Sequence, residues 1–202
     1  MQITSAVPPD IDEALGCAVA AFARDPITGF LLDPGPGYEE RLSQFYSLLM
    51  RARLALRMPV LVARDADRIR GMAMGYAAEC PPWPSGIAEE WDRFEAATAG
   101  LTERMAVYDE ITAKSKPPTP HYYLGVIAVD PGLHGRGLGT QLLKSFCDVS
   151  ANDPLSSGVY LETATPSNVR FYERSGFKET GRGNLGSATL WCMFRPHGRH
   201  DA

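Results

Sequence analysis

The segment from Val126 to Leu143, VIAVDPGLHGRGLGTQLL, has the composition of an anion-binding turn. Glycines at 135, 137 and 139 remove the side chains that would hold a phosphate away from the backbone. An amphipathic helix follows, and the N–H groups in the first turn of a helix have no partner within it. A pyrophosphate would accept hydrogen bonds from them and would be favoured by the positive end of the helix dipole. The alternative is an ordinary tight turn.

The spacing of these glycines excludes two common nucleotide-binding loops. A dinucleotide fingerprint reads GxGxxG after a first strand, and a P-loop ends in Gly-Lys followed by Ser or Thr. Here the three glycines alternate, lie past the middle of the chain and are not followed by Lys. Thr140 alone cannot make a magnesium site, and the four cysteines are too widely spaced to pair as metal ligands. We therefore expect no metal.

A second segment, VYLETATPSNVRFYERSGF from 159 to 177, places polar side chains beside a predicted strand end. It predicts a strand over 159–163, a turn through Pro166 and a helix over 167–175 that ends at Gly176.

Together the two segments resemble the coenzyme A signature of the GNAT acetyltransferase superfamily. Its first half reads Gln or Arg, two residues, Gly, one residue, then Gly or Ala; here it is His134-Gly-Arg-Gly-Leu-Gly139, with His in the first place. Asn168, Tyr172 and the Gly-Phe pair at 176–177 are similar to the second half. With the closing strand over 189–196, the C-terminal third is most similar to the puromycin N-acetyltransferase branch. The resemblance covers roughly residues 121–196, and the first 120 residues resemble the family only in the order of their elements.

The resemblance implies acetyl-coenzyme A as the co-substrate. In such proteins two central strands splay apart, the pantetheine pairs with the exposed strand backbone, the Asn contacts the pantetheine arm and the Tyr faces the thioester sulfur. Residues expected to contact the coenzyme are Ile127, Ala128, Val129, His134, Gly135, Arg136, Gly137, Leu138, Gly139, Thr140, Asn168 and Tyr172.

Amine acetylation needs a base, because an alkyl ammonium group with a pKa of about 10.4 is almost wholly protonated at neutral pH. Glu162 is the candidate, acting directly or through water, since it is the lone acid in the apolar strand Val-Tyr-Leu-Glu-Thr and shielding from water would raise its pKa. The alternative is a carboxylate paired with an Arg or with the backbone. Glu79, after the third strand, is the second choice.

Tyr172 is the candidate acid for the departing thiolate. A phenol with a pKa of about 10 keeps its proton at neutral pH and can give it, or a hydrogen bond, to a thiolate with a pKa of about 8.5. The alternative is a tyrosine that only packs beside Phe171 and Phe177. A backbone N–H near Val126 or Ile127 would meet the oxyanion.

Length and charge exclude several other classes of protein. A chain of 202 residues fits one domain, and we expect a single acetyltransferase domain over 1–202. The net charge of −4 leaves no basic footprint for nucleic acid or for anionic lipid. No apolar run approaches the roughly 18 residues that span a bilayer, and no signal-peptide pattern opens the chain. We expect a cytoplasmic monomer or homodimer.

The order of elements predicts an α/β fold: one mixed, mainly antiparallel sheet with a central, splayed parallel pair of strands and helices on both faces. Gly125 would permit a bulge that starts the splay, or a close approach to a helix. The coenzyme-binding core spans about 121–196 and the acceptor-side elements about 10–118. The expected strands are 3–7, 60–64, 69–77, 121–129, 158–163 and two at the end of the chain; the expected helices are 10–24, 38–57, 87–114 with a break at Gly100, 137–151 and 167–175.

Two inserts, 25–37 and 80–118, are expected to wall an acceptor pocket with Phe30, Leu31, Leu32, Trp83, Trp91 and Tyr108. Arg51, Arg53 and Arg57 suggest a solvated helix end, and the alternative is that they touch an anionic ligand. The function expected is acetyl-coenzyme A dependent N-acetylation of a small-molecule amine by direct attack in a ternary complex. The alternatives are a non-catalytic acyl-coenzyme A binding protein and a peptide or protein N-acetyltransferase.

Overall fold

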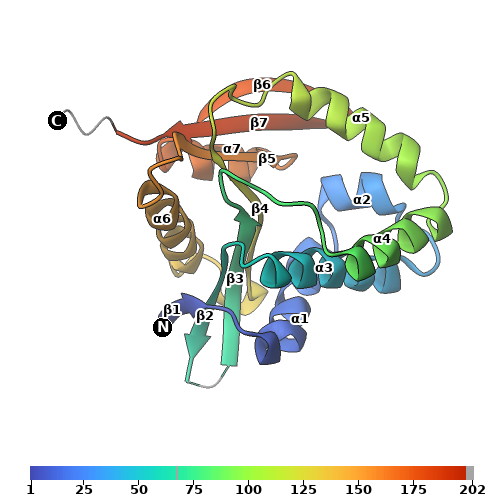
Figure 1. The fold of residues 1–202 in the computed structure, drawn as a ribbon, viewed down its shortest axis with the longest axis horizontal. Coiled ribbons are helices and arrows are strands. Elements are labelled where there is room, and N and C mark those ends of the chain that lie inside the picture. Colours follow the sequence, from blue (N-terminus) through green and yellow to red (C-terminus); the bar gives the residue numbers. More distant parts are fainter. Residues whose placement is uncertain (67, 199–202) are drawn as a thin grey trace.

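The computed structural model describes residues 1–66 and 68–198 (Figure 1). The strands are β1 (Gln2–Ser5), β2 (Val60–Asp65), β3 (Arg68–Tyr76), β4 (Tyr122–Val129), β5 (Gly158–Thr163), β6 (Lys178–Leu185) and β7 (Ala188–Pro196). The α-helices are α1 (Ile11–Phe22), α2 (Pro26–Leu32), α3 (Tyr38–Ala55), α4 (Ser85–Ala97), α5 (Leu101–Ala113), α6 (Leu138–Ala151) and α7 (Pro166–Arg174).

These strands form one mixed sheet in the order β1-β2-β3-β4-β5-β7-β6. Within the described ranges β4 and β5 are the parallel pair, and every other neighbouring pair is antiparallel. The expected α/β fold is therefore confirmed. The strands expected over 60–64 and 69–77 are present as β2 and β3, which pair antiparallel; Asp67, between them, lies outside the described residues.

The parallel pair opens soon after it begins. β4 pairs with β5 only at Tyr122 with Val159 and at Tyr123 with Tyr160, although both strands continue beyond these positions. The edge of β4 from 124 to 129 therefore has no strand beside it on the β5 side. An open strand edge offers N–H and C=O groups to an extended ligand.

A β-bulge at Gly125 accompanies this opening, as expected. Met74 of β3 lies opposite Val126 and the next residue, Gly75, lies opposite Leu124, so Gly125 has no partner on β3. Because side chains alternate along a strand, the extra residue reverses the faces beyond it. Leu124 packs in the core under α6, whereas Val126 packs in the core under α1 and α3.

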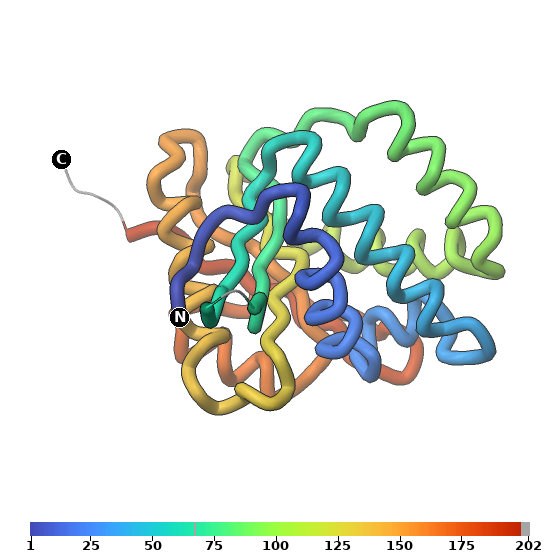
Figure 2. Tube along the Cα trace, turned by 90° about the horizontal axis from the view of Figure 1, so that it is seen from below, coloured from blue at the N-terminus to red at the C-terminus, as the bar shows by residue number. Residues whose placement is uncertain are grey.

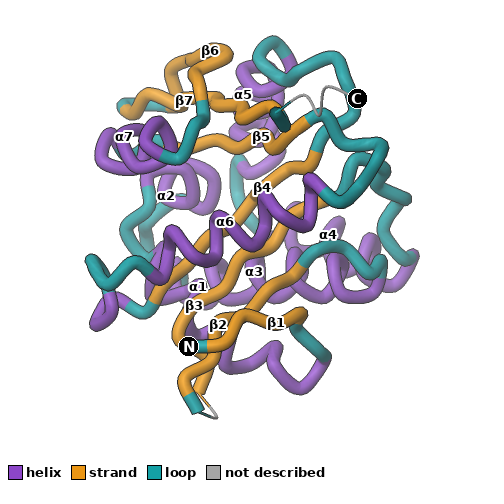
Figure 3. The backbone as a smooth tube through the Cα atoms, turned by 90° about the vertical axis from the view of Figure 1, so that its left-hand side faces the viewer, coloured by secondary structure: helices purple, strands orange, loops and turns teal. Residues whose placement is uncertain are grey.

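Helices cover both faces of the sheet (Figure 3). On one face α6 buries Leu142, Leu143 and Phe146 against the strands, and α7 joins the same core through Tyr172. On the other face α1 and α3 cover the alternate strand residues, including Met72 and Met74. Helices α4 and α5 lie on the α3 side (Figure 2), where they enlarge this second core.

The acceptor-side segments differ from the expected elements in one place. The insert 25–37, in which no helix was expected, contains α2. This helix begins because Pro26 suits the first helical position and the Asp25 carboxylate accepts hydrogen bonds from the N–H groups of Ile27 (2.9 Å) and Thr28 (3.0 Å).

The break expected at Gly100 in the helical segment 87–114 is confirmed, because the segment forms two helices, α4 and α5. Gly100 separates them in the left-handed conformation, with a φ of 70°.

No single helix in residues 1–66 and 68–198 is long and apolar enough to cross a membrane. One pair of helical segments, Pro8–Phe22 and Pro26–Leu32, passes the same test of length and composition together, with a bend of 98° between them. The same ranges contain no cluster of His, Cys, Asp and Glu side chains that could hold a metal ion.

Candidate active site

The glycine-rich turn before α6 presents unpaired backbone N–H groups. Gly135 and Gly137 have φ values of 77° and 80°, a conformation that favours glycine, and α6 begins at Leu138. The first helical hydrogen bond runs from the N–H of Gln141 to the carbonyl of Gly137, at 3.1 Å. The N–H groups at 138–140 have no acceptor among the described residues. This turn can therefore donate several hydrogen bonds to one anion.

A groove of about 590 Å³ runs over this turn, between α1, α7 and the end of β4. All the residues expected to contact the coenzyme line it except Ala128 and Arg136. Ala128 is 1% exposed because its side chain points into the opposite core, and only its backbone remains available. Arg24, which the sequence analysis did not single out, is exposed and also lines the groove, where its charge would attract phosphate.

The His134 side chain contacts the protein backbone. Its Nε2 atom lies 3.2 Å from the carbonyl oxygen of Val129, so the ring holds the end of β4 against the start of the turn. His134 stands where the family signature has Gln or Arg, and this difference does not affect the backbone N–H groups of the turn.

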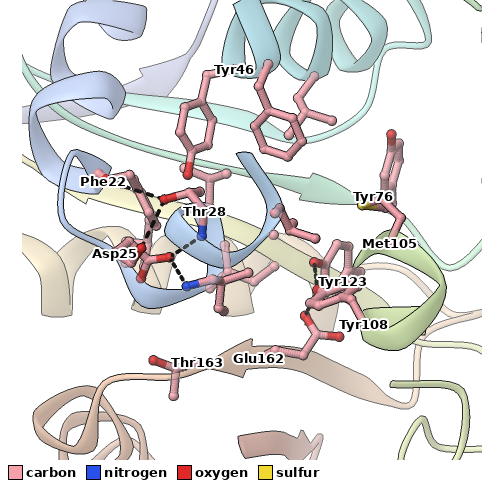
Figure 4. Close-up of a pocket in the computed structure, with 18 of the residues that line it drawn as sticks. Phe22, Asp25, Thr28, Tyr46, Tyr76, Met105, Tyr108, Tyr123, Glu162 and Thr163 are labelled. Carbon is pink, nitrogen blue, oxygen red and sulfur yellow. Dashed lines mark hydrogen bonds between the residues drawn. The ribbon is translucent and has the colours of Figure 1, made fainter. Parts of the chain in front are cut away.

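A second cavity, of about 330 Å³, lies on the α1 and α3 side of the sheet. Residues from α2, α3, α5, β4 and β5 line it (Figure 4). Both cavities share a wall made by Phe22, Asp25, Ile127, Asn168 and Tyr172. A molecule in the second cavity would therefore meet the end of a ligand held in the groove.

Glu162 lies at one side of this cavity in a cluster of tyrosine hydroxyls (Figure 4). The Tyr108 hydroxyl donates a hydrogen bond to Oε2 of Glu162 at 3.0 Å, and the same hydroxyl lies 3.2 Å from the Tyr123 hydroxyl. Burial raises the pKa of Glu162, and hydrogen bonding from Tyr123 and Tyr108 offsets part of that rise. Glu79, the second choice of base, is exposed and lines neither cavity.

Tyr172 stands in the shared wall and is 5% exposed. Its ring packs against Phe171 and Phe177, with centroids 5.1 and 5.6 Å away, so the packing role considered from the sequence is present. Its hydroxyl has no hydrogen-bond partner among the described residues. Burial, and then the negative charge of Asp25, raise the pKa of the phenol.

Asp25 faces the cavity from the side opposite Glu162 (Figure 4). Burial raises the pKa of its carboxyl, and the hydrogen bonds from Thr28 and Ile27 oppose that rise. The sequence signal that could have found it is the Asp-Pro pair, which is typical of a helix N-terminus.

The expectation that Arg53 is solvated is wrong. Arg53 is 2% exposed and lines the second cavity, because it falls one turn beyond Leu49 and two turns beyond Tyr46 on the inner side of α3. Its guanidinium carbon lies 4.2 Å from the centre of the Tyr76 ring, and its Nη1 donates to the carbonyl of Leu49 at 2.9 Å. Burial lowers the pKa of this guanidinium.

The expected cavity walls are partly correct. Leu31, Trp91 and Tyr108 line the cavity, whereas Phe30, Leu32 and Trp83 do not. Instead, the Trp83 indole donates a hydrogen bond to the Tyr76 hydroxyl at 2.8 Å. The lining residues that sequence reasoning missed include Thr28, Tyr46, Tyr76 and Tyr123.

The fold, with its anion-binding turn and two adjoining cavities, is that expected of an α/β protein that binds acyl-coenzyme A. Comparison with known families identifies the family. A model of the acetyltransferase (GNAT) family matches residues 30–177, so the chain belongs to that family. As a member of this family it is an N-acetyltransferase with acetyl-coenzyme A as co-substrate.

Two curated relatives from mycobacteria match 128 residues each, which is 60% of this chain. The N-alpha-acetyltransferase RimI of Mycobacterium tuberculosis is 27% identical, with 77% of its length covered. The uncharacterized protein ML0378 of Mycobacterium leprae is 28% identical, and the match spans about a third (34%) of its length.

Solved structures share the fold. A protein from Corynebacterium glutamicum described as histone acetyltransferase HPA2 and related acetyltransferase has a TM-score of 0.75 at 20% identity, over 100% of this chain and 98% of that one. The acetyltransferase yncA of Salmonella typhimurium, solved with its cofactor acetyl-CoA, has a TM-score of 0.57 at 19% identity, over 100% and 96%.

Proposed function

We propose that this protein transfers the acetyl group of acetyl-coenzyme A to the primary amine of a small molecule, by direct attack in a ternary complex. The observation that carries this proposal is the shared wall. A groove with the anion-binding turn and a separate cavity beside Glu162 meet at Asn168 and Tyr172. Two ligands held in these cavities would have their reacting ends adjacent, which supplies the proximity that acyl transfer needs.

The coenzyme would supply an activated acyl carbon as a thioester with a thiolate leaving group. The unpaired N–H groups at 138–140 would bind its pyrophosphate, and the open edge of β4 at Ile127 and Val129 would pair with its pantetheine arm. Asn168 lies in the shared wall, where its amide would contact the same arm.

Glu162 would accept the proton of the attacking amine, directly or through a water. The tyrosine hydroxyls around it orient the carboxylate toward the cavity. Tyr172 would donate a proton or a hydrogen bond to the departing thiolate, and an N–H of β4 near Val126 would stabilise the oxyanion.

The size and closure of the second cavity favour a small acceptor. Helices α2 and α5 cover it, and its volume of about 330 Å³ is near the lower end of small-molecule sites. The C-terminal resemblance to the puromycin N-acetyltransferase branch points in the same direction and stays a prediction, as do the cytoplasmic location and the monomeric or homodimeric state.

A second candidate is acetylation of a peptide or protein N-terminus. The similarity to a protein named N-alpha-acetyltransferase RimI favours it. Such a substrate needs an open exit for the rest of its chain, and residues of α2 and α5 line the cavity.

The test is release of free thiol from acetyl-coenzyme A with a panel of small primary amines and a matched panel of short peptides with free N-termini. We expect turnover with small amines and little with peptides. Faster turnover of peptides would support the second candidate instead. An absence of thiol release with both panels, from protein that binds acetyl-coenzyme A, would contradict the proposal.

A further inference from the structure

Arg53 is a buried cation without a carboxylate partner. It lies in the wall of the second cavity, which we call the acceptor cavity. Its side chain is almost fully buried, and no carboxylate of the described residues lies within 4 Å of it. Of its five N–H donors one is used by the Leu49 carbonyl, and its Nε has no hydrogen-bond partner. Burying an unpaired charge is costly, so a protein that retains one there gives it another partner.

Arg51 on the same helix shows that a carboxylate is the kind of partner that Arg53 lacks. Arg51 lies on the outer side of α3 and forms a two-pronged ion pair with Glu90, at 2.7 and 2.8 Å. Arg53 has only the face of the Tyr76 ring and one carbonyl. An arginine stays protonated through the ordinary pH range, so its charge persists in the cavity.

The guanidinium reaches the bulge of β4. A side-chain carbon placed at Gly125 would lie 3.2 Å from Nη2 of Arg53, so the absence of a side chain at Gly125 leaves room beside this nitrogen. Gly125 and Arg53 line the same cavity as Glu162, with Tyr123 lining it as well. The cavity therefore has a buried cation on α3 and a carboxyl group on β5. Asp25 lines it as well, and the exposed side chains of Asp109 and Lys116 lie at its edge.

We propose that the acceptor amine carries a carboxylate group on the same small molecule, and that Arg53 binds this carboxylate. The inference rests on the proposed function and narrows its substrate class to amino acids and related amino carboxylates. Such a molecule would place its carboxylate on the fork of Arg53 and its amine toward Glu162. A single guanidinium matches the single charge of a carboxylate, whereas a phosphate monoester carries nearly two.

The test compares amino carboxylates with their matched amides at equal concentrations of neutral amine, using thiol release from acetyl-coenzyme A. The wild-type protein is expected to prefer the carboxylate in kcat/KM by roughly 30-fold or more, the range for losing one partner of a buried charge pair. Arg53→Gln removes the charge and is expected to abolish this preference, because it should raise KM for carboxylates much more than KM for the matched amides. Arg53→Lys keeps the charge without the fork and is expected to be intermediate.

Arg57→Gln is the matched control, because Arg57 follows the same helix, is exposed and lies outside both active-site cavities. Calorimetric titration with acetyl-coenzyme A and urea unfolding check that each variant is folded and binds the coenzyme. If Arg53→Gln does not fold, the wild-type preference and Arg53→Lys decide the question.

Equal use of carboxylates and amides by the wild-type protein would overturn the role of Arg53 and leave the proposed function standing. A carboxylate preference that persists in Arg53→Gln would also overturn it. No thiol release with any amine would instead count against the proposed function itself.

Discussion

At the scale of single residues, the two candidate catalytic groups have pKa values moved in the directions that their roles require. Burial raises the pKa of Glu162, which brings a carboxylate closer to the neutral range and makes it a better base. Burial also raises the pKa of Tyr172, so its hydroxyl keeps its proton throughout that range. The same physical cause therefore favours a base in one residue and a proton donor in the other.

Replacement of Tyr172 by Phe is expected to leave the affinity for acetyl-coenzyme A unchanged and to lower kcat about 100-fold, since it removes one hydroxyl that acts mainly in the transition state. Calorimetric titration measures the first quantity and steady-state thiol release the second. Tyr122→Phe is the matched control, because Tyr122 is also a buried tyrosine but lines neither active-site cavity. Full turnover in Tyr172→Phe would remove this residue from the mechanism.

Replacement of Glu162 by Gln is expected to change the pH profile of kcat/KM. Only the ionised carboxylate accepts a proton, so the wild-type rate should fall as the pH drops through the Glu162 pKa, at a pH above the ordinary glutamate value of about 4.3. Glu162→Gln should remove that acidic limb and lower kcat/KM about 100-fold or more. Glu79→Gln is the comparison: if it moves the limb and Glu162→Gln does not, the base is Glu79.

At the scale of elements, what could be predicted from the sequence was the part whose signal is local. Six consecutive residues predict the turn before α6, and Gly125 is recognisable as a glycine in a strand of otherwise large side chains. Arg53 gave no such signal, because a charged residue at a helix end usually reaches water. Its burial follows from the packing of α3 against β3 and β4, which no short pattern contains.

Replacement of Gly137 by Glu is expected to weaken the binding of acetyl-coenzyme A at least about tenfold, because a carboxylate would stand where the turn should hold a pyrophosphate. Isothermal titration measures the affinity. Any side chain at this φ of 80° also costs about 1 to 2 kcal/mol of stability. Gly137→Ala carries that strain without the charge, and is expected to lose stability in urea but to keep most of the affinity. Wild-type affinity in Gly137→Glu would contradict the anion-binding role.

At the scale of the whole molecule, the site lies where β4 and β5 separate and divide the sheet into two halves. The coenzyme groove is built mostly from elements close together in the sequence, β4, α6 and α7, and the sequence therefore predicted most of its lining. The acceptor cavity draws on side chains separated by more than a hundred positions, from Phe22 to Glu162. Residues such as Phe22, Tyr46 and Leu49 read as ordinary core residues by themselves, so only the fold shows that they share a cavity with Glu162.

The junction of the two cavities also decides the kinetic mechanism. The two cavities are separate and adjacent, so both ligands could bind at once, and none of the four cysteines lines either cavity, so the structure offers no thiol there to carry the acetyl group. We therefore expect initial rates that require both substrates together, with intersecting double-reciprocal lines. Protein incubated with acetyl-coenzyme A alone should show an unchanged intact mass. Parallel lines, or an acetylated protein that passes its acetyl group to an amine after the coenzyme is removed, would indicate a covalent intermediate and exclude direct attack.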